Sequence, residues 1–186
     1  MRSLAIGTVI AAALGAFLFF VTGINTKSGT GAGAGPLPGI GSPAPNFSLP
    51  RLGSGAPMTL EALGKAAHRP VILNFFGSWC TPCQEETPLL SRTASAEQAK
   101  GSNIQFVGVD VNDDPGPAIA FVKQTGLPYP ILADRTSRVT SGLFGLYGAP
   151  YTYFISASGQ VLGLHKGPVT SSLLNPWLRR LGGTTG

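Results

Sequence analysis

Cysteine, histidine and charged side chains are all scarce in this chain of 186 residues. It has only two cysteines, so no disulfide within the chain is possible beyond one that joins this pair. His68 and His165 are the only histidines, and both lie far from the cysteines in sequence. Zinc sites usually have four ligands. Two cysteines close together and two histidines distant in sequence do not form such a site. We therefore expect no bound metal and no cofactor.

Basic residues are few and scattered. The net charge is only +5, and Arg179-Arg180 is the only basic doublet. Nucleic-acid binding calls for a basic stripe with interleaved aromatic side chains, and no such stripe is present. We expect no nucleic-acid partner.

Charge is absent from the apolar run between Leu4 and Val21, which reads LAIGTVIAAALGAFLFFV. Eighteen helical residues span roughly 27 Å, close to the hydrocarbon thickness of a bilayer. Arg2 precedes the run, which favours an amino terminus in the cytoplasm and the remainder on the outer face. We expect residues 1–23 to form a cytoplasmic stub and a transmembrane helix, giving a single-pass protein of the cell membrane.

A cleaved signal peptide is the alternative interpretation of this run. Signal peptides have apolar cores of about 7–15 residues followed by a small-x-small cleavage site. The apolar core of this run is longer than that. The bulky Phe19 and Phe20 occupy positions where a cleavage site would have small residues. Residues 32–34 (AGA) could serve as a cleavage site, but they lie far from the apolar core. No cysteine stands directly after the run, so a lipoprotein anchor is excluded. Residues 24–40 are rich in Gly, Ala and Pro and indicate a flexible linker, which leaves residues 41–186 as one domain.

The pattern within this domain predicts an α/β fold. Two nearly continuous apolar runs, residues 70–76 and 104–111, are typical of central strands that are covered on both faces. Further strands are expected over residues 130–133, 151–155 and 160–164, the last two forming a hairpin. Helices are expected over residues 80–100, 117–126, 136–144 and 173–181, with Asn175-Pro176 as an alternative start for the last. Together these elements predict a central mixed β-sheet flanked by helices on both faces.

The two cysteines form a Cys-x-x-Cys motif, Trp79-Cys80-Thr81-Pro82-Cys83, between an apolar strand and a helix. This arrangement is typical of a redox-active pair. Unpaired N–H groups and the macrodipole at the helix start stabilise a thiolate, so we expect the pKa of Cys80 to lie below that of a free thiol. Cys80 is then the nucleophile. Cys83, three residues on and on the same face, resolves the mixed disulfide.

The order of elements and the motifs resemble the thioredoxin fold, and more narrowly the membrane-anchored TlpA/ResA/CcmG group of thioredoxin-like proteins. Four segments carry the resemblance: residues 41–49 (GSPAPNFSL), residues 73–83 (LNFFGSWCTPC), Glu86 with Thr87-Pro88, and residues 148–155 (GAPYTYFI). The first is also similar to a segment of peroxiredoxins. The second resembles the active-site strand and loop of the group, and the fourth its cis-proline segment.

The resemblance implies an extracytoplasmic thiol–disulfide oxidoreductase, a reductase of specific protein disulfides such as those in cytochrome c or cytochrome oxidase maturation. It further implies a membrane electron donor of the CcdA/DsbD type. Asn74 stands where soluble thioredoxins carry a buried Asp, as is typical of the anchored group. Tyr151 stands where CcmG proteins usually have Glu, which argues against a dedicated CcmG role.

The resemblance also implies roles for residues beside the cysteines. Glu86 lies on the helix face of Cys83, where burial would raise the pKa of its carboxyl and let it take up the Cys83 proton; the alternative is a solvated acid like Glu85. In the group, Pro150 is a cis-proline that faces the cysteines and presents the backbone of Ala149 to a substrate strand. Trp79 is expected to be an exposed flank of the site, with a core aromatic as the alternative.

Other functions remain open at this stage. A disulfide oxidase or isomerase would differ from a reductase only in its reduction potential. Peroxiredoxins have a Thr shortly before the reactive Cys and an Arg that assists it. In this chain Ser78 and Trp79 precede Cys80. A copper chaperone of similar fold would space its cysteines more widely and recruit a His.

Overall fold

A computed structural model describes residues 36–182 of the chain. The expected anchor (residues 1–23) and most of the expected linker lie outside these residues. Among residues 36–182, no helix combines the length and the apolar character needed to cross a membrane.

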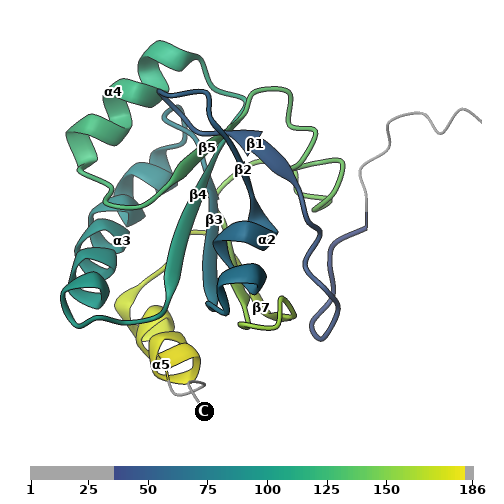
Figure 1. The fold of residues 1–186 in the computed structure, drawn as a ribbon. Helices are drawn as coiled ribbons and strands as arrows, with labels where there is room; N and C mark the ends of the chain where they lie inside the picture. The colour runs from purple at the N-terminus through teal and green to yellow at the C-terminus, as the bar shows by residue number, and fades with distance from the viewer. Residues whose placement is uncertain (1–35, 183–186) are drawn as a thin grey trace, which may run out of the picture. The chain divides into compact units, whose positions relative to one another are not determined.

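A five-stranded mixed sheet with strand order β5-β4-β3-β6-β7 forms the centre of the domain (Figure 1). Its strands are β3 (Val71–Phe76), β4 (Gln105–Val111), β5 (Ile131–Asp134), β6 (Tyr151–Ile155) and β7 (Val161–Lys166). β3, β4 and β5 run parallel, whereas β6 and β7 are antiparallel to their neighbours. Every residue of β3 is buried, which explains why its sequence is an almost unbroken apolar run. The mixed sheet predicted from the sequence is confirmed.

The three long helices cover one face of this sheet (Figure 1). They are α3 (Thr81–Ala99), α4 (Pro115–Thr125) and α5 (Ser171–Gly182). α3 and α4 each connect two parallel strands, and crossovers of one hand place both helices on the same side. Side chains of Ile72, Phe76 and Phe154 meet Leu90 of α3 and Leu174 of α5 in this layer. Both cysteines belong to the same apolar cluster.

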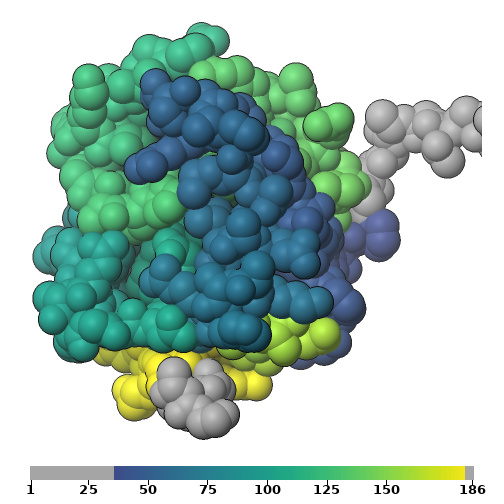
Figure 2. Space-filling view, in the orientation of Figure 1, coloured from purple at the N-terminus to yellow at the C-terminus, as the bar shows by residue number. Residues whose placement is uncertain are grey.

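The opposite face is covered by short elements that the sequence did not predict: β1 (Ser48–Pro50), β2 (Pro57–Thr59), α2 (Leu60–Leu63) and the 3-10 helix η1 (Lys65–Ala67). β1 and β2 pair as an antiparallel hairpin. Leu49 and Leu60 bury against Phe75 and Tyr153 of the sheet. Figure 2 shows this segment spread over the near surface of the domain.

Two helix predictions need correction. Residues 136–144 form a series of turns rather than a helix: Ser137 has a left-handed backbone (φ 54°), and the buried Asp134 carboxylate accepts both the N–H and the hydroxyl of Thr140. The last helix begins at Ser171, so Asn175-Pro176 does not mark its start. Pro176 is tolerated inside α5, whose Leu174 packs against the sheet face.

Candidate active site

The two cysteines are joined by a disulfide at the junction of β3 and α3. The S–S distance is 2.08 Å and the Cα atoms lie 5.2 Å apart. Cys80 is the N-cap of α3, and its sulfur accepts the Cys83 N–H at 3.3 Å. Cys80 is 4% exposed and Cys83 is fully buried, so Cys80 is the sulfur that a partner reaches first. The N-cap position also places Cys80 where helix N–H groups stabilise a thiolate.

The loop between β3 and Cys80 is hydrogen-bonded to the end of the neighbouring strand β4 and to the residues that follow it. The Ser78 N–H donates to Asp113 Oδ2 at 2.6 Å, and the Trp79 indole N–H donates to the Val111 carbonyl at 3.0 Å. Gln84 of α3 donates to the Ser78 carbonyl at 2.7 Å. Trp79 is 52% exposed, so it flanks the site and is not a core aromatic.

Glu86 lies on the buried side of α3, one turn beyond Cys83, and is only 2% exposed. Its two carboxylate oxygens each accept one hydrogen bond: Asn74 Nδ2 donates at 2.8 Å, and the Val169 N–H donates at 2.7 Å. Asn74 Nδ2 also donates to the Thr152 hydroxyl at 3.1 Å. Glu86 is therefore a fixed acid and not a solvated surface residue.

Burial decides the protonation of Glu86. Removal from water raises the pKa of the Glu86 carboxyl from 4.5 to about 7, although the hydrogen bonds from Val169 and Asn74 act in the opposite direction. A carboxyl with a pKa near neutrality can both accept and return a proton at physiological pH. The neighbouring Glu85, by contrast, is exposed to solvent.

The peptide bond between Ala149 and Pro150 is cis, as the family resemblance implied. Pro150 is buried, and Ala149 packs against the apolar cluster that contains both cysteines. The structure therefore places the cis-proline segment against the same apolar cluster as the disulfide, although the two are far apart in sequence. Tyr151 follows at the start of β6 and packs in the core on the other sheet face, where the Lys166 ammonium lies 5.8 Å from its ring centroid.

Sequence reasoning missed two parts of the site. Thr152 and the backbone of Val169 were not expected to contact the Asn74–Glu86 pair. Asp110, a buried acid of β4, was also overlooked. The available signal was a polar residue inside each of two largely apolar strands, Asn74 in β3 and Asp110 in β4.

Metal-ligating side chains do not gather among residues 36–182, where no group of three or more His, Cys, Asp or Glu is placed to hold an ion. His68 is exposed, and His165 is half-buried with its ring Nε2 3.3 Å from the Pro168 carbonyl.

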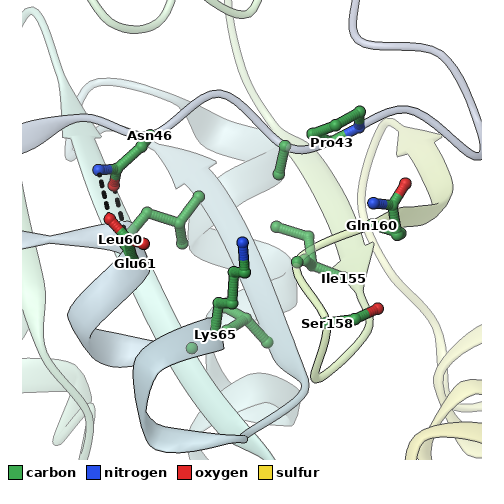
Figure 3. A pocket seen from close by; sticks show the side chains of 12 residues that line it. Pro43, Asn46, Leu60, Glu61, Lys65, Ile155, Ser158 and Gln160 are labelled. Carbon is green, nitrogen blue, oxygen red and sulfur yellow. Dashed lines mark hydrogen bonds between the residues drawn. The ribbon is translucent and has the colours of Figure 1, made fainter.

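A pocket of about 190 Å³ lies at the other end of β3 from the disulfide (Figure 3). Leu60, Val71 and Ile155 supply its apolar lining, and Lys65 extends beside it. Asn46 and Glu61 meet at its edge, where the Glu61 N–H donates to Asn46 Oδ1 at 2.9 Å. This bond ties the start of the domain to α2. The lining offers no thiol, so the chemistry belongs to the disulfide end of the sheet.

Comparisons with known proteins cover most of the described domain. A model of the AhpC/TSA family matches residues 40–163, which include both cysteines and the cis-proline. The thiol-disulfide oxidoreductase ResA of Bacillus thuringiensis (strain Al Hakam) is 30% identical over 143 residues, covering 76% of this chain and 78% of ResA. The thiol:disulfide interchange protein DsbE of Xylella fastidiosa (strain 9a5c) is 30% identical over 135 residues, covering 73% of this chain and 65% of DsbE.

Solved structures agree on the fold. A thiol:disulfide interchange protein of the thioredoxin family from Chlorobium tepidum TLS superposes with a TM-score of 0.64 at 25% identity, covering 77% of this chain and 97% of that one. The described domain therefore has the thioredoxin-like fold that the sequence motifs indicated.

Proposed function

This chain belongs to the AhpC/TSA family as a thiol-disulfide oxidoreductase of the ResA, DsbE and CycY kind, and from this premise we propose that it reduces specific protein disulfides outside the cytoplasm. The observation that carries the proposal is the placement of Cys80 at the N-cap of α3 with the buried Glu86 two turns further along. Such a site supplies a stabilised thiolate and, behind it, a proton acceptor for the second thiol.

The proposed reaction starts from the reduced pair. The Cys80 thiolate attacks one sulfur of the target disulfide, which forms a mixed disulfide and releases one target thiolate. Cys83 then gives its proton to Glu86 and attacks the Cys80 sulfur. The Cys80–Cys83 disulfide forms, the second target sulfur leaves as a thiolate, and two electrons have passed to the target. A membrane dithiol donor of the CcdA/DsbD type then reduces the pair again.

Target recognition is assigned to the surface around Cys80. Trp79 is exposed on one flank, and Tyr147, 74% exposed, precedes the cis-proline segment. An extended target segment pairing with the backbone of Ala149 would bring its disulfide over Cys80. Proteins undergoing cytochrome c or cytochrome oxidase maturation are the proposed targets. Tyr151 at the position after Pro150 favours a role different from that of CcmG.

The proposed location rests on the sequence of residues 1–40. An uncharged apolar run preceded by Arg2 and followed by a Gly/Ala/Pro linker suits a single-pass anchor with the domain on the outer face. Protease treatment of spheroplasts should digest the domain, and carbonate washing should leave the chain in the membrane. Intact domain after protease treatment, or release by carbonate, would contradict this location.

The direction of electron flow is tested by the reduction potential of the Cys80–Cys83 pair, measured against glutathione buffers. A value near that of thioredoxin, about −270 mV, supports a reductase. A value near that of DsbA, about −120 mV, overturns it in favour of an oxidase.

The assignment of the two sulfurs is tested separately. Cys83→Ser should accumulate a mixed disulfide through Cys80, whereas Cys80→Ser should trap nothing and reduce nothing. Accumulation of the mixed disulfide in Cys80→Ser would reverse the two roles.

A further inference from the structure

Asp110 of β4 is a buried acid to which no N–H or hydroxyl group of the described residues donates. It is 1% exposed, and neither of its carboxylate oxygens accepts a hydrogen bond from the described residues. Side chains alternate along a strand, and Val109 and Val111 pack on the face covered by α2. Asp110 therefore points to the opposite face, where Phe106 packs in the cluster of the two cysteines. A buried acid without a hydrogen-bond donor is rare enough to need a physical explanation.

Its position in the sheet connects it to the active-site loop. Asp110 is paired in register with Phe76, the last residue of β3 before that loop. The segment that follows, residues 110–113, makes the two hydrogen bonds already described to Ser78 and Trp79. We call residues 110–113 the clamp segment. Asp110 is its buried end, and Asn112, exposed and with a left-handed φ of 47°, is its turning point.

Two charged groups act on the Asp110 carboxyl, Asp113 from the clamp segment and Arg135 from the loop after β5. Burial, then the negative charge of Asp113 and a side-chain hydrogen bond with Asp113, raise the pKa of Asp110 from 3.8 to about 7, while Arg135 opposes this rise. The carboxyl is therefore neutral in mildly acidic solution and acquires its charge around neutrality. An ionised Asp110 carboxylate would need hydrogen-bond donors, and no described residue supplies one.

We propose that Asp110 is a positioning residue for Cys80, and that its neutral carboxyl permits the clamp segment to hold Ser78 and Trp79. Loss of the proton draws the clamp segment outward toward water, so the hydrogen bond from the Trp79 indole weakens. The charge also lies on the sheet face of the cysteines, where it disfavours a thiolate at Cys80. This role is independent of which protein the enzyme reduces.

The Trp79 indole N–H reports on the clamp segment directly, because it donates to Val111 within that segment. Its cross-peak in ¹H–¹⁵N spectra of the oxidised protein is assigned by comparison with W177F, since Trp177 is the only other tryptophan. Its chemical shift should change with a midpoint near pH 7 in the wild type. In D110N, which is isosteric and always neutral, the shift should stay at its acid-form value. A full transition in D110N, or none in the wild type, overturns the proposal.

Two variants that retain Asp110 make the test independent of the folding of D110N. D113N removes the charge that raises the Asp110 pKa while keeping an oxygen to accept the Ser78 N–H, so the midpoint should move to lower pH. R135Q should move it to higher pH. E86Q should leave it in place, which separates Asp110 from the other acid that titrates near neutrality. Shifts of the same sign in D113N and R135Q, or loss of the transition in E86Q, contradict the proposal.

A kinetic readout tests the effect on the reaction. Alkylation of Cys80 by iodoacetamide in the reduced protein should be roughly threefold faster in D110N than in the wild type at about pH 8, because the variant carries no negative charge near the thiolate. The two rates should converge at about pH 5. Equal rates at both pH values would show that Asp110 does not act on Cys80.

Discussion

The side-chain amide of Asn74 donates to the carboxylate of Glu86 across 2.8 Å inside the domain, joining the central strand β3 to the active-site helix α3. Both residues are almost completely buried. The amide supplies a donor but no charge, so it orients Glu86 without neutralising it. A cation at residue 74 would hold Glu86 permanently ionised, whereas Asn leaves its pKa near neutrality.

Glu86→Gln should slow the second step of the reaction, in which Cys83 loses its proton and attacks the mixed disulfide. Gln cannot accept that proton, and loss of a general base of this kind slows proton transfer by about a hundredfold or more. Stopped-flow measurement of mixed-disulfide resolution near neutral pH tests this. Glu85→Gln, one residue away and exposed, is the matched control and should behave as wild type. A rate-against-pH curve of Glu86→Gln that superimposes on wild type would remove Glu86 from the mechanism.

Asn74→Ala should raise the pKa of Glu86 above its wild-type value of about 7, because it deletes a hydrogen bond that favours the charged form. A rise of roughly half a unit to one unit is expected, read from the ¹³C shift of the Glu86 carboxyl during a pH titration. Thr152→Val is the control, since it removes the other acceptor of Asn74 and leaves the Asn74–Glu86 bond in place. A lower midpoint in Asn74→Ala would show that the amide does not stabilise the carboxylate.

Stability should fall as the pH rises from about 4.5 to about 7. Glu86 binds a proton more tightly in the folded state, where its pKa is about 7, than in the unfolded state near 4.5. The folded protein therefore holds more protons in this window, so deprotonation favours unfolding and the loss is complete above pH 7. For Glu86 alone the loss is roughly 3 kcal/mol. The pKa of Asp110 is also raised in the folded state, so the deprotonation of Asp110 further lowers the stability as the pH rises.

Urea unfolding of the oxidised protein at about pH 5 and about pH 8 measures this loss. The loss should be smaller in Glu86→Gln, since one of the two titrating acids is gone, and smaller again when Asp110→Asn is added. Unchanged pH dependence in the double variant would mean that other groups are responsible.

The strands and the disulfide were predictable because local sequence specifies them. β3 and β4 are buried on both faces, so their composition alone indicates central strands. The Cys80–Cys83 spacing at a strand–helix junction predicted the redox pair. β1 and α2 were not predictable, since three or four residues carry no periodicity and their folding depends on burying Leu49 and Leu60 against the sheet.

The hydrogen-bond partners of Glu86 and Asn74 could not be predicted from local sequence for a different reason. Val169 lies 83 residues from Glu86 in sequence, and Thr152 lies 78 residues from Asn74. Only the packing of β6 and of the segment before α5 brings them together. The family resemblance, together with the spacing from Cys83, identified Glu86 as a candidate, but the size of its pKa shift depends on this long-range burial.

Gly163→Ala should destabilise the domain, because a β-carbon on this residue of β7 would overlap the ring of Trp177. That ring stacks on Phe154 with centroids 4.3 Å apart and fixes α5 to the sheet. Overpacking of this kind costs about 1–3 kcal/mol. The urea midpoint of Gly163→Ala should therefore fall below that of the wild type, and a gain in stability would show that α5 is not held by this stack.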